Sequence, residues 1–435
     1  MARAIDSVAV LGAGTMGSGI AALCAEAGCR VLLLDVTREA AGCALERLTE
    51  GTSPALEDPA AGARITPGSL DDLLALADHD WICEAIIEDL AAKRALLKRV
   101  EPLRREGSVV STNTSGIPLH AITQGMPERL RRDIAVTHFF NPVKVMRLVE
   151  LVPGRDTTPE VTSTLRRFLS EALGKGVVDA KDTVNFIANR IGCFWMLSGL
   201  HRAKDALEQG LTMEAIDALM SKPVGIPATG LYGLMDLIGL DVMDLVARNL
   251  ASNLPEGDVG RGFASLPASE RAMLGRGQLG RKSGGGFYRL LKLEDGSRRK
   301  DTFDLTPEAW RPAEQVELAP EHRDVRSLLF ADDAAGRFAW HLVGGTLCYA
   351  ANLVPEIAED VVNVDRAMRW GFNWAKGPFE LLDAIGPERV IARLTTERRP
   401  LPAMLAVLRE AGAPAFYSQD NRHLGRDGVF HPMPD

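Results

Sequence analysis

Short apolar runs alternate with helix-forming stretches over the first part of the chain. Runs rich in Val, Leu and Ile are typical of strands buried on both faces of a parallel sheet. They occur at 7–11, 30–34, 81–87 and 108–111. Helical patterns lie between them at 18–27, 39–50, 91–105, and more briefly at 70–77 after a Pro- and Gly-bearing loop over 51–68. The pattern predicts an α/β fold with an N-terminal Rossmann-type, doubly wound parallel sheet.

The segment 134–152 departs from this pattern. Two alternating apolar runs flank Asn141-Pro142, and proline cannot donate to a strand ladder, so we expect strand, exposed loop, strand. His138 lies near the end of the first run, and Glu150 follows twelve positions later in the second. Once the chain has turned back, the two could form a general base and its orienting carboxylate. Taken alone, the segment favours a simpler interpretation, a surface histidine and a solvated glutamate.

From Pro159 onward helical periodicity takes over. A helix is expected over 164–173 and a brief strand at 177–178, and a long helix with an apolar stripe follows from 184. That helix also carries Asn189, which is either a polar residue beside the stripe or an amide that lies over a cofactor edge.

The helical remainder contains a repeat. Its first copy has Asp217, Met220, Gly230, Asp236, Gly239 and Phe287-Tyr288, and its second has Asp365, Met368, Gly377, Asp383, Gly386 and Phe416-Tyr417. The spacing within the matching pieces is kept, which indicates a duplicated helical module. The second copy has no counterpart of Ser115, His138 or Glu150 upstream and is expected to be structural.

These patterns divide the chain into four parts. We expect a Rossmann domain over 1–182, a first helical module over 183–290, a charged flexible linker over 291–324, and a second, degenerate module over 325–435.

A glycine-rich turn follows the first strand. Gly12, Gly14 and Gly17 lie between that strand and a helix, and the next strand ends at Asp35, 18 residues beyond the third glycine. This spacing is typical of a dinucleotide site, with the pyrophosphate at the helix N-terminus. Asp35 would accept hydrogen bonds from the ribose and repel a 2′-phosphate, which favours NAD, although Arg38 leaves NADP as an alternative.

Three polar residues share one position in the predicted sheet. Glu88, Ser115 and His138 all follow the carboxyl ends of strands, where doubly wound sheets bind their ligands. This shared position favours a catalytic role for His138 over the simpler interpretation.

Composition narrows the remaining classes. The 435 residues are 46% hydrophobic and carry a net charge of -8, which argues against general nucleic-acid binding. Six scattered cysteines show no metal or disulfide spacing, so no metal site is expected. The chain begins almost directly with a strand and has no apolar run long enough for a bilayer. The expectation is a cytoplasmic protein without a leader peptide.

Six motifs in order resemble those of the L-3-hydroxyacyl-CoA dehydrogenases of fatty-acid β-oxidation. They are GAGTMG, STNTSG, HFFNPVKVMRLVE, NFIANRIG, DLIGLD and GRKSGGGFY, and the resemblance covers residues 8–288. The later stretch GFNWAKGPFELLDAIG resembles the duplicated C-terminal module of longer members, including the dehydrogenase part of proteins fused to an enoyl-CoA hydratase.

The resemblance implies roles for particular residues. Its catalytic positions fall on Ser115, His138, Glu150 and Asn189. It adds Glu88, Lys93, Asn141 and Lys282 to the cofactor-binding positions of the glycine turn and second strand, which are Gly12, Gly14, Thr15, Met16, Gly17 and Asp35.

The implied reaction is NAD-dependent oxidation of an L-3-hydroxyacyl-CoA to a 3-ketoacyl-CoA. His138 would take the hydroxyl proton, Glu150 would orient it, and Ser115 and Asn189 would hold the C3 and thioester oxygens. The chain departs from the family where Ala228-Thr229-Gly230-Leu231 replaces GPF, and in the short, lysine-free segment after Asp35, which bears on CoA affinity.

Two alternatives stay open. One is a dehydrogenase for a small hydroxy acid without CoA, and the other is a non-catalytic, structural NAD-binding relative. Retention of all four candidate catalytic residues counts against the second. The resemblance also implies an acyl-CoA thioester substrate and an enoyl-CoA hydratase domain or partner. Because the duplicated module could replace a partner subunit, a monomer is favoured over a homodimer.

Overall fold

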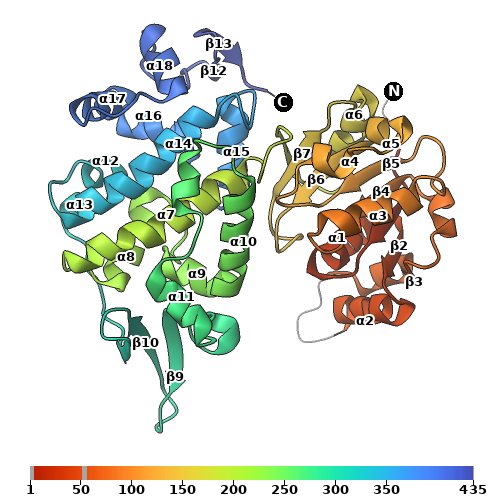
Figure 1. Ribbon diagram of the computed structural model, residues 1–435, viewed down its shortest axis with the longest axis horizontal. Coiled ribbons are helices and arrows are strands. Elements are labelled where there is room, and N and C mark those ends of the chain that lie inside the picture. Colours follow the sequence, from red (N-terminus) through yellow and green to blue (C-terminus); the bar gives the residue numbers. More distant parts are fainter. Residues whose placement is uncertain (1–3, 51–55, 435) are drawn as a thin grey trace. The chain divides into compact units, whose positions relative to one another are not determined.

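The computed structural model describes residues 4–50 and 56–434. The chain divides into two compact units (Figure 1). The first unit comprises Met1–Ile187 and Glu356–Glu359, and the second comprises Ala188–Pro355 and Asp360–Asp435. None of the described helices combines the length and apolar character needed to cross a membrane.

An eight-stranded sheet organises the first unit, in the order β3-β2-β1-β4-β5-β6-β7-β8. Neighbouring strands run parallel except for β6 and β7, which are antiparallel. The strands are β1 Ser7–Leu11, β2 Arg30–Asp35, β3 Ile65–Ser69, β4 Trp81–Glu84, β5 Val109–Thr112, β6 Ile134–Phe139, β7 Leu148–Pro153 and β8 Gly176–Asp179. The predicted α/β class is confirmed, but the sheet is mixed, because the short 140–147 connection returns the chain directly to the neighbouring position.

Helices cover this sheet on both faces, which explains why its strands are apolar throughout. Val8 and Val10 of β1 belong to one core cluster, whereas Ala9 and Leu11 belong to another. Successive residues of a strand point to opposite faces, so both faces of β1 are buried. The helices are α1 Thr15–Glu26, α2 Arg38–Thr49, α3 Leu90–Val100, α4 Leu119–Thr123, α5 Glu128–Asp133 and α6 Pro159–Arg167.

Two sequence predictions in this unit need correction. The predicted loop over 51–68 contains the 3-10 turn Pro59–Arg64 and most of strand β3, while its residues 51–55 lie outside the described part of the chain. Pro67 and Gly68 concealed this strand from the sequence prediction. The proline is tolerated because β3 lies at the edge of the sheet. The predicted helix over 70–77 is only a 3-10 turn at Leu74–Asp78.

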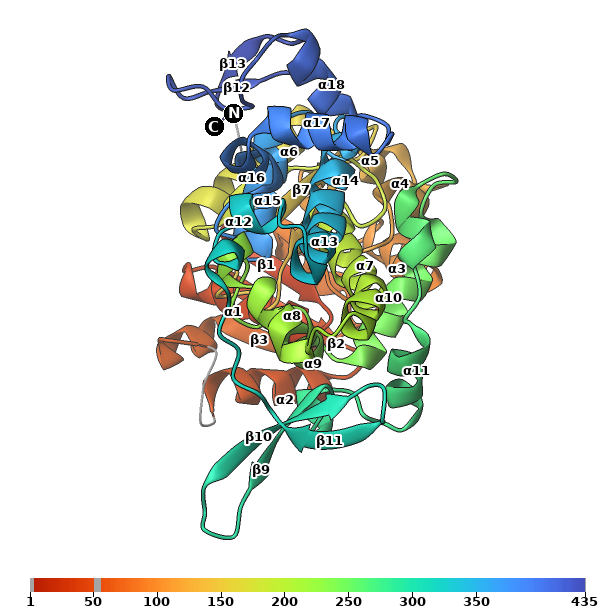
Figure 2. The same ribbon diagram turned by 90° about the vertical axis from the view of Figure 1, so that its left-hand side faces the viewer.

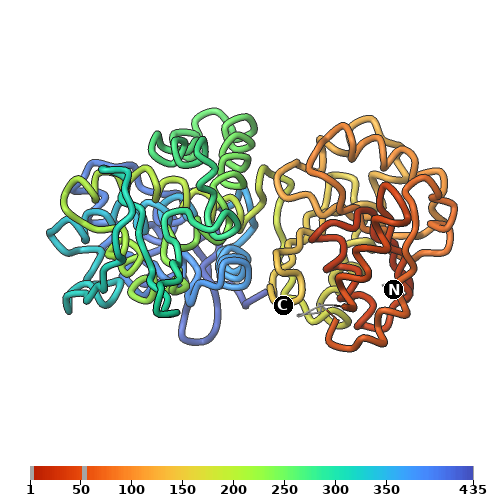
Figure 3. The backbone as a smooth tube through the Cα atoms, turned by 90° about the horizontal axis from the view of Figure 1, so that it is seen from below, coloured from red at the N-terminus to blue at the C-terminus, as the bar shows by residue number. Residues whose placement is uncertain are grey.

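The second unit is largely helical (Figures 2 and 3). Its helices are α7 Ala188–Glu208, α8 Met213–Leu219, α9 Tyr232–Ile238, α10 Leu240–Asn253, α11 Ala268–Gly275, α12 Val325–Leu328, α13 Ala334–Ala339, α14 Gly345–Leu353, α15 Val361–Gly371, α16 Pro378–Ile385, α17 Pro387–Thr396 and α18 Ala403–Glu410. Two small antiparallel sheets accompany them, formed by β9 Tyr288–Lys292, β10 Arg298–Asp304 and β11 Ala309–Pro312, and by β12 Arg422–Leu424 and β13 Phe430–Pro432.

The stretch 291–324, expected to be a flexible linker, carries β10 and β11. Figure 2 shows them with β9 as one small sheet. Asp301 and Phe303 of β10 are buried, and Asp301 pairs with Arg289 of the neighbouring strand. Charge pairing across the strands explains why so polar a segment is ordered. The domain boundaries themselves stay a prediction.

The repeated positions form the same hydrogen-bond network twice. In the first copy, Asp217 accepts hydrogen bonds from two amides at the start of α9, at 2.7 and 3.1 Å, and from the Tyr288 hydroxyl at 2.8 Å. In the second, Asp365 accepts from two first-turn amides of α16, at 2.8 and 2.9 Å, and from the Tyr417 hydroxyl at 2.7 Å. Each aspartate therefore satisfies helix N–H groups that have no partner within the helix.

The second aspartate of each copy completes the network. Asp236 accepts the backbone N–H groups of Phe287 and Tyr288 at 2.8 and 2.7 Å. Asp383 accepts those of Phe416 and Tyr417 at 2.8 and 3.0 Å. The two helical modules predicted from the repeat are thus built by the same contacts.

Candidate active site

His138 and Glu150 lie directly opposite each other on strands β6 and β7. The His138 Nδ1 atom is 2.7 Å from Glu150 Oε2, and both side chains are buried. A carboxylate can only accept, so Nδ1 carries the shared proton and Nε2 is left as the basic nitrogen. The other carboxylate oxygen, Oε1, accepts the backbone N–H of Ile187 at 3.0 Å. The strand–loop–strand prediction for 134–152 is confirmed, and its register forms this pair.

Ser115 completes a chain of hydrogen bonds from the core to the surface. Its Oγ lies 3.1 Å from His138 Nε2, on the side of the imidazole away from Glu150. Ser115 is exposed, whereas His138 is 2% exposed and Glu150 is 0% exposed. The Nε2 atom of the imidazole therefore lies beside an exposed hydroxyl.

Glu88 fixes the loop that carries Ser115. Its Oε1 accepts hydrogen bonds from the Thr114 hydroxyl at 2.7 Å and from the backbone N–H groups of Ser115 and Gly116, both at 2.8 Å. Burial raises the pKa of Glu88, but the Lys93 ammonium and these donors outweigh it and hold the pKa below its ordinary value. The carboxylate is therefore charged at neutral pH and keeps the serine loop in place.

Lys93 lies behind this loop between two carboxylates. Its ammonium is 2.8 Å from Glu84 and 3.3 Å from Glu88, and the side chain is 1% exposed. Glu84 also accepts the Thr112 hydroxyl at 2.5 Å. The sequence suggested Lys93 and Glu88 as cofactor contacts, and in the structure they bind each other. A contact of either one with the cofactor stays a prediction.

Sequence reasoning missed Asn113 as a residue of the site. Its Oδ1 accepts the backbone N–H of Phe139 at 2.9 Å, which ties the end of β5 to the end of β6 beside His138. Sequence reasoning also missed the adjacent Thr114. Both lie within the STNTSG motif, so the only available signal was their proximity to Ser115 in the sequence.

The glycine turn fits a dinucleotide. Gly12 has φ +106°, and a Cβ placed there would lie 2.5 Å from the Ala85 carbonyl oxygen. A Cβ at Gly17 would lie 1.8 Å from the Gly12 carbonyl oxygen, so helix and turn pack too closely for a side chain. A Cβ at Gly14 would meet open space, so a ligand can approach the backbone there.

The start of helix α1 leaves donors for this ligand. Its N-cap, Gly14, provides no side-chain hydrogen bond, so the first-turn amides beginning at Thr15 and Met16 are available to an anion. Asp35, at the end of β2, accepts the N–H groups of Ala13 at 2.6 Å and of Val36 at 2.7 Å. These bonds place the carboxylate beside the glycine turn, and a bond to a ribose stays a prediction.

A cavity of about 330 Å³ in the first unit lies along α1. It is lined by Thr15 and Asn141, both predicted cofactor-binding positions, and by Arg47 and Lys144 among others. Asn141 itself is exposed in the connection between β6 and β7.

The remaining predicted site residues belong to the second unit. Asn189 lies in the first turn of α7 and is the only residue among the described residues 185–200 that is not buried. Lys282 is exposed, and its ammonium lies 2.5 Å from the Asp241 carboxylate. Their approach to the His138 site stays a prediction.

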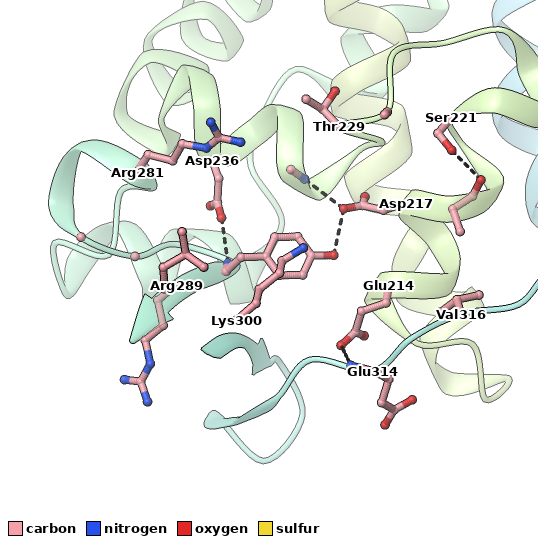
Figure 4. Close-up of a pocket in the computed structure, with 17 residues that line it drawn as sticks. Glu214, Asp217, Ser221, Thr229, Asp236, Arg281, Arg289, Lys300, Glu314 and Val316 are labelled. Carbon is pink, nitrogen blue, oxygen red and sulfur yellow. Dashed lines mark hydrogen bonds between the residues drawn. The ribbon is translucent and has the colours of Figure 1, made fainter. Parts of the chain in front are cut away.

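A larger cavity, of about 910 Å³, lies in the second unit (Figure 4). Asp217 and Asp236 bind Tyr288 from either end, and the Lys300 ammonium lies 3.6 Å from the centre of the Tyr288 ring. Burial raises the pKa of Asp217 to about 7 and that of Asp236 to about 6. Shifted pKa values in a cavity often mark functional sites. Here the second copy has the same network, which indicates a structural role.

No group of three or more His, Cys, Asp or Glu residues positioned to hold a metal ion occurs within residues 4–50 and 56–434.

Comparison with known families places the chain among dehydrogenases. Residues 7–183 match the model "3-hydroxyacyl-CoA dehydrogenase, NAD binding domain", and residues 186–290 match "3-hydroxyacyl-CoA dehydrogenase, C-terminal domain". A probable 3-hydroxyacyl-CoA dehydrogenase of Bacillus subtilis (strain 168) is 34% identical over 97% of this chain and 56% of its own length.

Two further similarities extend past the first helical module. A putative fatty acid oxidation complex trifunctional enzyme of Rickettsia felis is 34% identical over 93% of this chain and 57% of its own length. The crystal structure of 3-hydroxybutyryl-CoA dehydrogenase from Escherichia coli K12 superposes with a TM-score of 0.68 and 26% identity, covering 91% of this chain and 95% of that one. The chain spans little more than half the length of the two curated relatives.

Proposed function

The chain belongs to the 3-hydroxyacyl-CoA dehydrogenase family, and from this premise we propose that it oxidises L-3-hydroxyacyl-CoA to 3-ketoacyl-CoA in fatty-acid oxidation, with NAD as cofactor. One observation carries the proposal: a buried His138 bonded on one side to a buried carboxylate and on the other to an exposed serine. An imidazole held in this way is suited to remove a proton from an alcohol.

His138 is the general base of the proposed reaction. Its Nε2 takes the proton of the C3 hydroxyl, and Nδ1 keeps its own proton in the bond to Glu150. The imidazolium that forms is stabilised by the Glu150 carboxylate at 2.7 Å. NAD, when bound, supplies the acceptor for the C3 hydride. The glycine turn and the open first turn of α1 hold its pyrophosphate.

Ser115 and Asn189 hold the oxygens of the substrate. The Ser115 hydroxyl, 3.1 Å from His138 Nε2, can bond the C3 oxygen while the proton moves. The Asn189 amide donates to the C3 or thioester oxygen. Glu88 acts one step further back, because its bonds to the backbone of the serine loop keep the Ser115 hydroxyl oriented toward the imidazole.

The second helical module bears on partners and assembly. The relative from Rickettsia felis is named a trifunctional enzyme of fatty-acid oxidation, and this chain matches about half of it. We therefore propose that the chain works together with an enoyl-CoA hydratase as partner or further domain. We also propose that the duplicated module replaces a partner subunit. A sedimentation mass of twice the chain mass would contradict the monomer.

The test is oxidation of NADH by acetoacetyl-CoA, followed at 340 nm. His138→Ala is expected to lower kcat by about 10²- to 10⁴-fold, as removal of a general base does, while the Kd for NADH stays within about twofold. His431→Ala is the matched control, because His431 also pairs with a carboxylate, at 3.0 Å from Asp427, but lies outside the site. It should leave kcat unchanged.

Three results would contradict parts of the proposal. Full activity in His138→Ala would remove the base assignment. Turnover of a free hydroxy acid, with none of the thioester, would change the substrate class. NADH binding without turnover of acyl-CoA of any chain length would favour the non-catalytic relative.

A further inference from the structure

A buried arginine lies at the start of the 21-residue helix α7 in the second unit. Arg190 is 1% exposed. Its Nε donates to the Tyr349 hydroxyl at 2.7 Å, and its Nη2 pairs with the Asp258 carboxylate. Removing a guanidinium from water costs several kcal/mol unless partners surround it. The first turn of α7 is therefore held where these partners can reach Arg190.

Tyr349, from helix α14 of the second helical copy, completes this network. Its hydroxyl accepts from Arg190 and donates to Asp258, at 3.1 Å from each carboxylate oxygen. Its ring stacks on Phe194, with ring centres 4.1 Å apart and planes 22° apart. Phe194 lies one helical turn beyond Arg190, so Tyr349 contacts α7 at two successive turns.

The third member ties the network to the first copy. Asp258 follows α10 and caps the 3-10 turn Val259–Phe263, where it accepts the Gly260 N–H at 2.6 Å. The rings of Phe263 and Phe194 pack edge to face, with their centres 5.7 Å apart. Two copies of the module thus meet on one face of the first turns of α7.

The backbone leading into α7 makes this anchoring necessary. Asn185 has φ 61° and Phe186 has φ 49°, so the chain enters the helix through two left-handed residues. Such residues cost energy and persist only where the surrounding structure fixes them. The start of α7 therefore does not continue an earlier regular element, and its rotation about the helix axis depends on side-chain contacts such as those of Arg190.

Asn189 is the residue that this rotation aims. Adjacent helical residues project about 100° apart around the axis, so an inward Arg190 sets the direction of Asn189. All other described residues between 185 and 200 are buried, and Asn189 alone reaches the surface of the unit. We propose that Tyr349 is a positioning residue: through Arg190 it fixes the first turn of α7 and thereby the direction of the Asn189 amide. This role rests on the proposed function, in which that amide binds substrate.

The test variant is Tyr349→Phe, which removes the hydroxyl but keeps the ring on Phe194. Displacement of the Asn189 amide is expected to lower kcat about tenfold. This is less than the roughly 10²-fold loss that a 1 Å misplacement of a reacting group can cause. The Kd for NADH should stay within about twofold. Tyr417→Phe is the matched control, because it also removes a tyrosine hydroxyl from a carboxylate, at 2.7 Å from Asp365, and should leave kcat unchanged.

A double-mutant cycle separates positioning from general damage. If Tyr349 acts through Asn189, then Tyr349→Phe should change kcat less than twofold once Asn189→Ala is present. An equal fold-loss in both backgrounds would overturn the proposal and leave the proposed function intact. An inactive wild-type chain would instead count against the proposed function.

Hydrogen exchange tests the proposal without turnover. The amides of residues 188–194 should exchange faster in Tyr349→Phe than in wild type or Tyr417→Phe, because the first turn of α7 has lost an anchor. Unchanged exchange would overturn the positioning role. Should Tyr349→Phe fail to fold, Asp258→Asn removes the charge from the same network, and the same increase in exchange is expected.

Discussion

The two helical copies use the same three residues in different surroundings. Each has an aspartate that caps a helix and binds a tyrosine hydroxyl, and a second aspartate that holds the backbone of the same tyrosine. In the first copy, Asp217 lines a cavity and is half-buried. In the second, Asp365 is 2% exposed. The same bonds therefore exist with and without access to solvent.

A raised aspartate pKa does not by itself identify a catalytic residue in this chain. Burial raises the pKa of Asp217 to about 7 and that of Asp365 to about 8. Considered alone, Asp217 in its cavity resembles a catalytic acid. Its counterpart has a similar shift although the second copy has no match for the catalytic motifs. The shift therefore belongs to the architecture of the module.

The largest expected loss of stability comes from replacing the capping aspartate of either copy, one at a time. Asp365→Ala leaves two amides and a hydroxyl buried without partners, which should lower the free energy of unfolding by about 3–5 kcal/mol. Asp217→Ala removes the same three bonds beside a cavity, where water can replace the carboxylate, and should cost about 1–2 kcal/mol.

Urea unfolding followed by tryptophan fluorescence would measure both losses. It reports mainly on the second unit, which holds Trp195, Trp310, Trp340, Trp370 and Trp374. Equal losses in the two copies would mean that solvent access does not distinguish them.

A pH-dependent effect on stability is expected at Glu214 in the first copy. Glu214 of α8 accepts the Arg311 guanidinium at 2.8 Å and the Thr302 hydroxyl at 2.7 Å, which fastens the β9–β11 sheet to the module. Burial raises the pKa of Glu214, but these donors outweigh it and lower the pKa to about 2. When folding lowers the pKa of a carboxyl group, its charged form stabilises the fold at pH values above the ordinary pKa. This stabilisation is lost as the pH falls through the lowered pKa.

Glu214→Gln should therefore lower the free energy of unfolding by about 1–2 kcal/mol at pH 7, after allowance for solvent screening. The difference from wild type should shrink as the pH falls from about 4.5 toward 2. Glu308→Gln, in the turn between β10 and β11, is the control, since its pairing with Arg276 at 3.2 Å is exposed. A difference that stays constant with pH would show that the carboxylate charge is not what holds the sheet.

The smallest effect is expected at Lys300, which lies over the Tyr288 ring at 3.6 Å. The side chain is exposed, so Lys300→Gln should lower the free energy of unfolding by no more than about 0.5 kcal/mol. Lys292→Gln, on the adjacent strand, controls for the loss of one surface charge. A loss above about 2 kcal/mol would instead make Lys300 an integral part of the first copy's network.

The sequence predicted those parts of the molecule that local chemistry determines. The glycine turn is recognisable because Gly12 and Gly17 leave no room for a Cβ. The pairing of His138 with Glu150 follows from alternation around a short connection. The repeat was visible because its aspartates accept backbone N–H groups and tyrosine hydroxyls at fixed offsets, which keeps their spacing.

Other features depend on residues that meet only in the folded chain. Strand β3 was hidden by Pro67 and Gly68, whose weak strand preference is overridden by pairing with β2. Strand β10 lies in the stretch expected to be a flexible linker, because its charged residues gave no sign that Asp301 pairs with Arg289 and Arg299. The cofactor contact expected for Lys93 stays a prediction, and its two carboxylate partners, from β4 and the loop after it, were not anticipated.

The hydrogen-bonded series Glu150, His138 and Ser115 also sets when a proton can leave the protein. His138 is 2% exposed, and its Nε2 atom lies 3.1 Å from the hydroxyl of the exposed Ser115. In the proposed reaction, substrate bound at Ser115 covers the imidazole on that side. If His138 is the base, we therefore expect its proton to stay in the site until the ketone product departs. Acidification of the surrounding solution should then follow product release in time rather than hydride transfer.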